Sequence, residues 1–297
     1  MYPWLQTTYN QLATRKQENK LHHALLLQGP SGIGKTEFVK QLATLLLCAK
    51  SVNGQSCGQC QSCLLQKAGN HPDNHEVMSE KQIGVDQIRD AIKKLSGSAQ
   101  LSGAKVLIIH AAHSMTESSA NALLKTLEEP TANTYLLLVT NKAERLLPTI
   151  ISRCERIAMP VPTFAQTSAW LIKQWPEPVD EEFIHLYANS PLSLLNELQQ
   201  EQSVPYADFK RGLEGLMTQQ INPSKLANDW QTQVEKLLKW LQFWLHLQVK
   251  KSPQLSPQLW QLHQEAIQAV KRVRNPGVNK VLVLNQLLTD ISLLKSH

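Results

Sequence analysis

Residues 29–36 of the chain, GPSGIGKT, match the phosphate-binding pattern G-x-x-x-x-G-K-[ST] at every position. Glycines in such a loop let successive backbone N–H groups turn toward phosphate oxygens, and the start of a following helix adds partial positive charge. Lys35 would reach the outer phosphates, and the Thr36 hydroxyl would hold Mg²⁺. The alternatives are a chance loop and a vestigial nucleotide site. The predicted nucleotide-binding residues are Gly29, Pro30, Ser31, Gly32, Ile33, Gly34, Lys35 and Thr36.

The acidic residues that support nucleotide hydrolysis are missing from the place where this kind of site needs them. A P-loop ATPase places an Asp at the end of a second buried strand to hold the metal, and many add a Glu that polarises water. The candidate strand, residues 106–109, runs into His110 and Ala111. Mg²⁺ prefers oxygen ligands to imidazole, and alanine has no polar atom. Glu128 and Glu129 follow a predicted helix and are in the wrong place. We therefore expect ATP or ADP with Mg²⁺ to be held without being hydrolysed.

Four of the five cysteines fall within sixteen residues with the spacing C-x8-C-x2-C-x2-C, at Cys48, Cys57, Cys60 and Cys63. In a reducing cytosol this spacing favours metal binding over disulfides. Four sulfurs complete a closed tetrahedral zinc site, which stabilises a loop and leaves no open position for catalysis. Unligated thiols are the alternative. His71 and His75 lie nearby and are interpreted as ordinary loop histidines.

These candidate residues need elements that position them, and apolar runs predict such elements. The predicted strands are residues 23–29, 105–112 and 134–140, and the predicted helices are 35–47 and 118–127. Unbroken apolar strands separated by helices indicate a parallel sheet that is covered on both faces. This is an α/β fold in which the phosphate loop follows the first strand.

After a linker at residues 160–163 the sequence contains no convincing strand. Three short helices are predicted at residues 164–175, 181–188 and 192–200. After a polar break at 202–205, one long amphipathic helix is predicted to carry Leu226, Trp230, Val234, Leu237, Leu241 and Trp244, and a last one Val281, Leu284, Leu288 and Ile291. Apolar stripes of this kind face a core, so we assign them no chemistry.

Length and composition set wide limits on function. The 297 residues allow two or three domains, and 42% hydrophobic with 18% charged residues fits a soluble globular protein. The net charge of +6, without a long basic tract, permits nucleic-acid contact without requiring it. There is no secretion signal and no apolar run of roughly 20 residues. We therefore expect a cytoplasmic protein without membrane association.

Taken together, the motifs resemble the AAA+ subunits of bacterial DNA polymerase III clamp loaders. The resemblance covers roughly residues 20–160 and extends more weakly to the end of the chain. The matching segments are HHALLLQGPSGIGKT, the four-cysteine insertion, HPD at 71–73, GVDQIRDAI at 84–92, SSANALLKTLEEP at 118–130, TIISRC at 149–154 and, more weakly, RNPGVNKVLVLNQLL at 274–288.

Two subunit types of this family share the pattern. The gamma/tau motor keeps an Asp-Glu pair after the second strand and a nucleotide-sensing Arg in its second domain. Here His110 and Ala111 replace the pair, and Leu192 stands where the sensor arginine would be. The chain also ends before the extensions that motor subunits carry. These departures favour the non-hydrolysing delta-prime type, although an intact phosphate loop is unexpected for it.

The resemblance implies three domains: an AAA+ P-loop core at 1–161 with a zinc-binding insertion at 48–63, a three-helix lid at 162–203, and an all-α collar at 204–297. It also implies a heteropentameric ring with gamma/tau motors and a delta subunit, which loads the sliding clamp onto primed DNA for the polymerase holoenzyme. Arg153 would be an arginine finger that acts in trans, in the ATP site of a neighbouring motor. The isolated chain is then expected to catalyse nothing.

Two other functions stay open at this point. One is an active motor ATPase of the gamma/tau type, which would have to hydrolyse ATP without the usual acids. The other is a stand-alone zinc-containing nucleic-acid-binding protein. The cysteine cluster lacks interleaved basic and aromatic residues, which makes it a poor surface for reading DNA.

Overall fold

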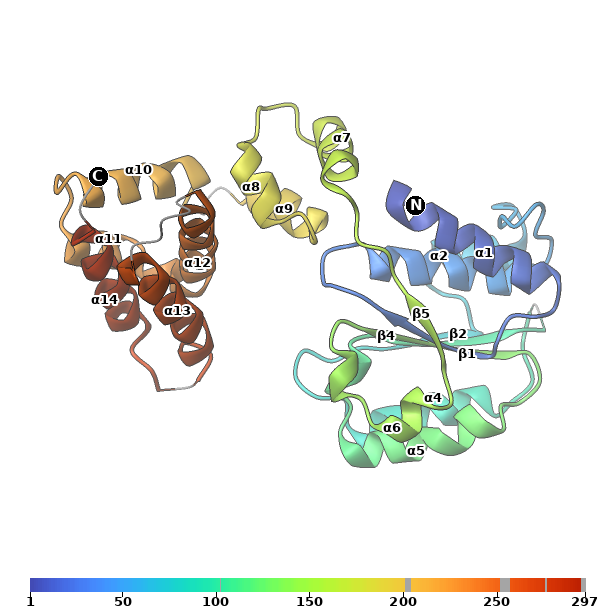
Figure 1. Cartoon of the computed structure of the whole chain (residues 1–297). Coiled ribbons are helices and arrows are strands. Elements are labelled where there is room, and N and C mark those ends of the chain that lie inside the picture. Colours follow the sequence, from blue (N-terminus) through green and yellow to red (C-terminus); the bar gives the residue numbers. More distant parts are fainter. Residues whose placement is uncertain (102, 201–203, 252–256, 276, 295–297) are drawn as a thin grey trace. The chain divides into compact units, whose positions relative to one another are not determined.

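The structure of the chain, a computed structural model, describes residues 1–101, 103–200, 204–251, 257–275 and 277–294. These residues form two compact units (Figure 1), which are Met1–Leu171 with Ala188–Ser193, and Ile172–Tyr187 with Leu194–His297. None of the described helices is both long and apolar enough to cross a bilayer. The predicted boundaries of a lid and a collar, at residues 161 and 203, stay predictions.

The first unit contains a five-stranded sheet in which every pair of neighbouring strands is parallel. The order is β2-β3-β4-β1-β5, with β1 Ala24–Gln28, β2 Asn74–Val77, β3 Lys105–Ile109, β4 Thr134–Thr140 and β5 Glu155–Ala158. The three predicted strands are confirmed, while β2 and β5 were not predicted. Because all strands run the same way, the residues that follow β1, β3 and β4 meet at the carboxyl edge of the sheet.

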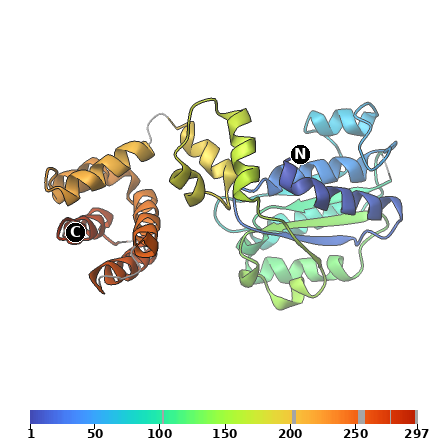
Figure 2. The same ribbon diagram turned by 45° about the horizontal axis from the view of Figure 1, so that its top comes forward.

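Helices cover both faces of this sheet, as predicted (Figure 2). Alternate strand residues point to opposite faces, so Leu25 and Leu27 pack under one helical layer while Ala24 and Leu26 pack under the other. One layer is α1 Gln6–Gln17 and α2 Lys35–Leu47; the other is α4 Val85–Leu95, α5 Glu117–Glu128 and α6 Pro148–Ile151. A short helix in the cysteine insertion, α3 Gln61–Lys67, packs against α2.

A buried lysine fixes the start of β3 against the end of α4. The Lys105 amine donates to the Leu95 and Gly97 carbonyl oxygens, both at 2.6 Å, and to Thr131 Oγ1 at 2.7 Å. The lysine is 4% exposed, so these three acceptors replace the water that its charge would otherwise require. Lys105 is therefore a structural residue of the sheet.

The remaining described residues form helices and the loops that join them. The three predicted short helices are present as α7 Phe164–Gln174, α8 Glu181–Leu186 and α9 Pro191–Leu198. They are followed by α10 Tyr206–Met217, α11 Pro223–Asp229, α12 Val234–Lys251, α13 Pro257–Arg272 and α14 Lys280–Ser292. The last predicted helix corresponds to α14, where Leu284, Leu288 and Ile291 are buried.

The prediction of one continuous helix through Leu226 and Trp244 is wrong. Helix α11 ends at Asp229, a 3₁₀ turn follows, and α12 begins at Val234. Trp230 has φ −96° and ψ 2°, outside the helical range, and its ring stacks on Phe209 at 5.5 Å between centroids. Packing of this ring against α10 thus interrupts a stripe whose spacing alone suggested a single helix.

An aromatic cluster forms the core of the second unit. Trp240 packs edge-on against the rings of Phe183, Tyr206 and Phe209, with centroids 5.2 to 5.5 Å apart. Its indole N–H donates to the Tyr187 hydroxyl at 3.1 Å, which satisfies the one polar atom that the ring buries.

Candidate functional site

The predicted phosphate loop lies between β1 and α2, at the carboxyl edge of the sheet. Gly32 and Gly34 have φ values of 74° and 93°, in the left-handed region. A Cβ on Gly32 would lie 2.4 Å from Ser193 Oγ, and one on Gly34 would lie 2.3 Å from the Tyr2 ring. The path of the loop therefore requires glycine at both positions.

Every carbonyl group of residues 29–33 accepts a hydrogen bond, and the donors come from three parts of the chain. The Lys35 amine donates to the first two carbonyls, Ser190 and Leu192 donate to the next two, and Trp4 donates to the last. The bonds are Lys35 Nζ to Gly29 O (2.8 Å) and Pro30 O (2.5 Å), Ser190 Oγ to Ser31 O (2.6 Å), Leu192 N to Gly32 O (3.0 Å) and Trp4 Nε1 to Ile33 O (2.9 Å). The loop backbone is thus fixed from its carbonyl side by the protein itself.

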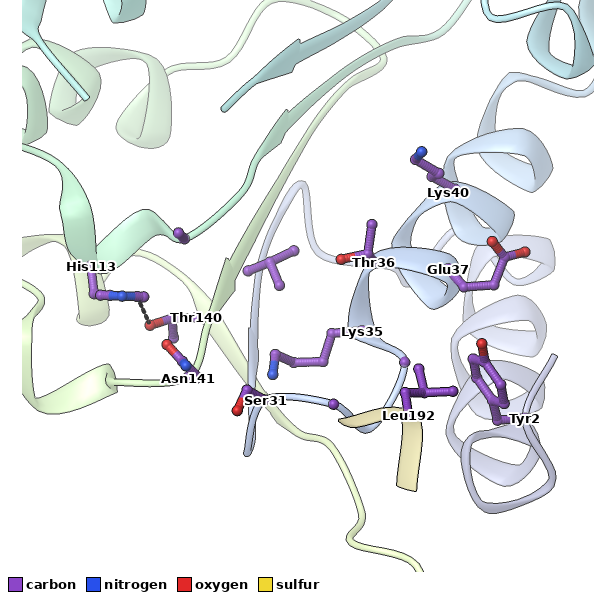
Figure 3. A pocket seen from close by; sticks show the side chains of 14 residues that line it. Tyr2, Ser31, Lys35, Thr36, Glu37, Lys40, His113, Thr140, Asn141 and Leu192 are labelled. Carbon is purple, nitrogen blue, oxygen red and sulfur yellow. Dashed lines mark hydrogen bonds between the residues drawn. The ribbon is translucent and has the colours of Figure 1, made fainter. Parts of the chain in front are cut away.

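The loop lysine points back into its own loop. Figure 3 shows the Lys35 amine beside Ser31, where it bonds to the two carbonyls just described. The residue is 8% exposed, and burial lowers the pKa of its amine to about 8. Phosphate oxygens would favour the charged amine and compete with those carbonyls for it.

A pocket of about 580 Å³ opens in front of the loop. Besides the loop itself, α2 contributes Lys40 and the end of β4 contributes Thr140 and Asn141, while Tyr2 and Leu192 line one side (Figure 3). Four of these lining residues, Tyr2, Lys40, Thr140 and Asn141, were not predicted for this site. The signal for the last two is topological, since residues that follow parallel strands converge at one edge.

The end of β3 confirms that no acid follows this strand. His110 is 7% exposed, and its Nε2 atom lies 2.9 Å from Glu76 Oε2 on the neighbouring strand. The hydrogen bond to His110 lowers the pKa of Glu76, against the effect of burial. Ala111 lines the pocket, and among the lining residues in the described chain Glu37, on α2, is the one carboxylate. The pocket suits phosphate better than it suits a divalent metal.

A histidine occupies the pocket wall beyond Ala111. His113 Nδ1 lies 3.0 Å from Thr140 Oγ1 (Figure 3), which ties the segment after β3 to the end of β4. Burial, followed by the charges of Lys142 and Arg145, lowers the pKa of His113. The imidazole is therefore neutral at pH 7 and offers no extra cation to the pocket.

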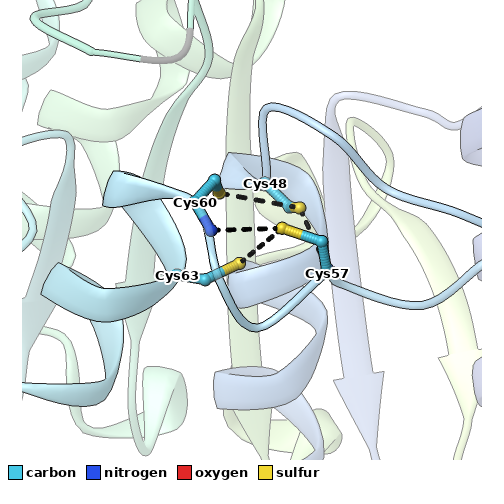
Figure 4. Close-up of side chains that lie close together, drawn as sticks. All are labelled: Cys48, Cys57, Cys60 and Cys63. Carbon is cyan, nitrogen blue, oxygen red and sulfur yellow. Dashed lines mark hydrogen bonds between the residues drawn. The ribbon is translucent and has the colours of Figure 1, made fainter.

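The four predicted cysteine ligands converge (Figure 4), with their sulfurs all within 4.8 Å of one another. The Sγ atoms of Cys48 and Cys60 are 4.0 Å apart, as are those of Cys57 and Cys63. Zinc–sulfur bonds of about 2.3 Å in a tetrahedron place sulfurs roughly 3.8 Å apart, so the cluster fits a closed zinc site. The described chain contains no other group of three or more metal-binding side chains this close together.

The surroundings of the sulfurs also fit a cation. Backbone N–H groups of Gln59 and Cys60 lower the pKa of the Cys57 thiol, whereas burial and neighbouring sulfurs raise that of Cys63 to about 12. Four sulfurs at these distances cannot all be thiolates unless a positive ion balances their charge. His71 is buried in the loop before β2, where it accepts a hydrogen bond from the Asp73 N–H at 3.1 Å. The prediction that His75 is also a loop residue is wrong, because His75 lies in β2.

Arg153 follows α6 and lies at a second surface depression, of about 790 Å³. Its Nε donates to Glu128 Oε1 at 2.6 Å and its Nη1 donates to the Thr149 carbonyl at 3.0 Å, while Nη2 pairs with Glu128 as well. Arg15 on the same face forms a bidentate pair with Glu155, at 2.6 and 2.7 Å. Each arginine thus has a glutamate partner within the chain.

Arg153 and the phosphate loop lie at opposite edges of the sheet. Leu25 at the start of β1 pairs with Glu155 at the start of β5, so Arg153, two residues before β5, is at the amino edge. The loop follows the other end of β1, and the five residues of that strand span roughly 17 Å. Arg153 therefore cannot act on a phosphate bound in the chain's own loop.

Comparison with known proteins identifies the family. A family model described as "DNA polymerase III, delta subunit" matches residues 4–163. The DNA polymerase III subunit delta' of Pseudomonas aeruginosa is 41% identical over 236 residues, which is 77% of this chain and 71% of that protein. The subunit delta' of Haemophilus influenzae is 43% identical over 173 residues, 58% of this chain and 53% of the relative.

A solved structure supports the fold. The crystal structure of a DNA polymerase III gamma subunit-related protein from Thermotoga maritima matches with a TM-score of 0.51 at 20% identity, covering 95% of this chain and 98% of that one. The chain belongs to the delta-prime subunit family of DNA polymerase III.

Proposed function

We propose that the chain is a non-hydrolysing subunit of a DNA polymerase III clamp loader and helps to load the sliding clamp onto primed DNA. The observation that carries the proposal is the end of β3, where His110 and Ala111 follow the strand and Ala111 lines the pocket of an intact phosphate loop. Glu76, a carboxylate at the end of the next strand, is held by His110. A site built this way lacks the acids that position a metal and an attacking water. The delta-prime names of the relatives agree with this role.

The phosphate loop is proposed to hold ATP or ADP without cleaving it. Support comes from the pocket in front of the loop, from the cationic side chains of Lys35 and Lys40 on its wall, and from the left-handed glycines. The Thr36 hydroxyl would be the loop's ligand for any Mg²⁺ that accompanies the nucleotide. No acid follows β3, and the one carboxylate among the described lining residues is Glu37 on α2, so the site lacks the acid that activates water in P-loop ATPases.

Arg153 is proposed to act as an arginine finger in the ATP site of an adjacent gamma/tau motor, within a heteropentameric ring that also contains delta. Its place at the amino edge supports action in trans, because its own loop is at the opposite edge. A guanidinium group next to a transferring phosphate stabilises the charge of the transition state. This role would place the chain in the cytoplasm, with the clamp and primed DNA reached through the assembly.

The four cysteines are proposed to hold a structural Zn²⁺ that folds residues 48–63. The sulfur–sulfur distances support this ion and leave no open coordination position, so the site would contribute stability and no chemistry. The insertion packs on α2 through α3, so it would stabilise the helix that begins at the phosphate loop.

A first experiment separates this proposal from an active motor. We expect the isolated chain to bind nucleotide but to show no steady-state ATPase activity above background. Robust turnover that is abolished by Lys35→Ala would overturn the proposal. Reconstitution with gamma/tau and delta, followed by clamp-loading assays with and without this chain, tests the role itself, and loading that proceeds equally well without it would argue against that role.

A second experiment tests Arg153 in the reconstituted loader. We expect Arg153→Ala to leave ring assembly intact and to lower the DNA-stimulated ATPase and loading rates. A sole arginine finger contributes about 10³ or more in rate, and the loss here should be smaller because only one of several sites is affected. Arg156→Ala, an exposed arginine three residues away, is the matched control. Equal rates for the two variants would remove the role that we assign to Arg153.

A further inference from the structure

We infer that Glu128 is a positioning residue that holds Arg153 in a resting place and thereby limits how readily this arginine reaches a phosphoryl group on a partner. The inference rests on the proposed role of Arg153 and adds a residue to it.

All three nitrogen atoms of the Arg153 guanidinium are engaged within the chain. Nε donates to Glu128 Oε1 at 2.6 Å, and Nη2 pairs with the same carboxylate. Nη1 donates to the Thr149 carbonyl at 3.0 Å and to Ser152 Oγ at 3.3 Å. Two of the three nitrogens thus depend on Glu128, so an acceptor on a partner has to displace this carboxylate before it can take a bidentate contact.

The position of Glu128 makes it dependent on that arginine in turn. Glu128 is the last residue of α5, where the helix end carries partial negative charge and a carboxylate is unfavourable without a nearby cation. The side chains of Arg153 and Glu128 are 33% and 48% exposed, so an incoming anion can reach the pair. Exposed ion pairs contribute little free energy, so Glu128 can position the arginine and still be displaced by another acceptor.

Arg15 and Lys20, which line the same depression, are also paired with carboxylates. Arg15 is paired with Glu155, whose pKa its hydrogen bond lowers, and Lys20 lies 2.9 Å from Glu18. Exchange of Glu128 for a carboxylate on a partner would replace one such pair by an equivalent one. A terminal phosphoryl group carries more charge and more acceptor oxygens than a carboxylate. Exchange of Glu128 for a phosphoryl group therefore lowers the free energy, whereas exchange for another carboxylate leaves it nearly unchanged. The resting pair thus favours phosphate over acidic side chains.

The test uses Glu128→Gln in the reconstituted loader, since glutamine keeps the size of the side chain and loses its charge. We expect kcat of the DNA-stimulated ATPase to rise about two- to fivefold, the range that follows from releasing one exposed ion pair, with KM for ATP unchanged. Glu128→Asp, which retains the charge, should stay near wild type. The control is Glu129→Gln, which makes the same change of charge at the exposed neighbouring residue and should alter neither constant.

The variant is combined with Arg153→Ala to show whether Glu128 acts through the arginine. We expect the double variant to match Arg153→Ala alone. The inference is overturned if Glu128→Gln behaves like Glu129→Gln, lowers kcat, or has the same effect with and without Arg153. A different result, in which Arg153→Ala itself leaves the ATPase unchanged, would instead refute the proposed role of the arginine.

Discussion

Nucleotide binding to the phosphate loop should weaken steeply above pH 8, because of the buried lysine. Burial lowers the pKa of the Lys35 amine to about 8 in the free chain. Phosphate oxygens favour the charged amine, so they raise its pKa toward or above the ordinary value of about 10.4. Above pH 8 binding must therefore take up a proton, and the dissociation constant rises with pH.

The size of the effect follows from the two pKa values. With a free value of about 8 and a bound value above 10, Kd is multiplied by about 1.1 at pH 7 and by about 11 at pH 9. We thus expect roughly a tenfold increase in Kd for ADP between these pH values. Titration of a fluorescent ADP analogue, followed by anisotropy, measures it. Lys35→Arg is the matched variant, because its guanidinium stays charged and its profile should be flat.

The titration of Lys35 can be distinguished from that of the other groups in the pocket. The pKa of His113 is lowered and that of Tyr2 is raised, mainly by burial in both cases, so both titrate outside this window. Lys40 also lines the pocket, and Lys40→Ala should weaken ADP binding without changing how Kd depends on pH. A wild-type Kd that changes less than twofold, or a Lys35→Arg profile as steep as wild type, would refute the reasoning.

Three further predictions concern stability. Lys105→Met removes three hydrogen bonds, at about 1 kcal/mol each, and should lower the free energy of unfolding in urea by about 3 kcal/mol. The exposed Lys94→Met should change this free energy little. Cys60→Ser, or treatment with a strong chelator, should reduce the zinc content measured by mass spectrometry well below about one ion per chain. Either change should also speed proteolysis within residues 48–63. Full retention of zinc by the variant would contradict the four-sulfur site. Gly34→Ala should lower the free energy of unfolding by more than about 1 kcal/mol, because Gly34 has a left-handed backbone and the Tyr2 ring lies against it. Gly97→Ala is the control, since a methyl group there meets open space. Equal losses of stability in the two variants would refute this prediction.

The strands and helices that bury continuous apolar surface could be predicted from the sequence. Helix α2 and strand β4 have the predicted bounds, since each is apolar over its whole length or along one face. Strands β2 and β5 were missed because they are four residues long, mix polar with apolar side chains and lie at the edges of the sheet. Edge strands need little apolar character, so composition does not mark them.

The candidate site was predictable where it is local in sequence and not where it is assembled from distant parts. The phosphate loop and the four cysteines are each contained within sixteen residues, and the structure places them as a loop and as a cluster. The donors from Trp4, Ser190 and Leu192 lie 29 to 160 positions from their acceptors, and no spacing rule marks them. The sequence places Glu128 where it cannot hold the metal, and no spacing pattern indicates its partner Arg153, 25 positions away.

The donors that hold the loop carbonyls also limit what a bound nucleotide can signal. A ligand shifts a conformational equilibrium only by the difference between its affinities for the two states. Residues 190–192 bond to the loop carbonyls through Ser190 Oγ and the Leu192 amide, and neither hydrogen bond needs a nucleotide as a partner. Occupancy of the pocket and movement of this segment would then be thermodynamically uncoupled. In the proposed ring, a subunit built in this way would report little about its own nucleotide, and the other members would set the response to ATP.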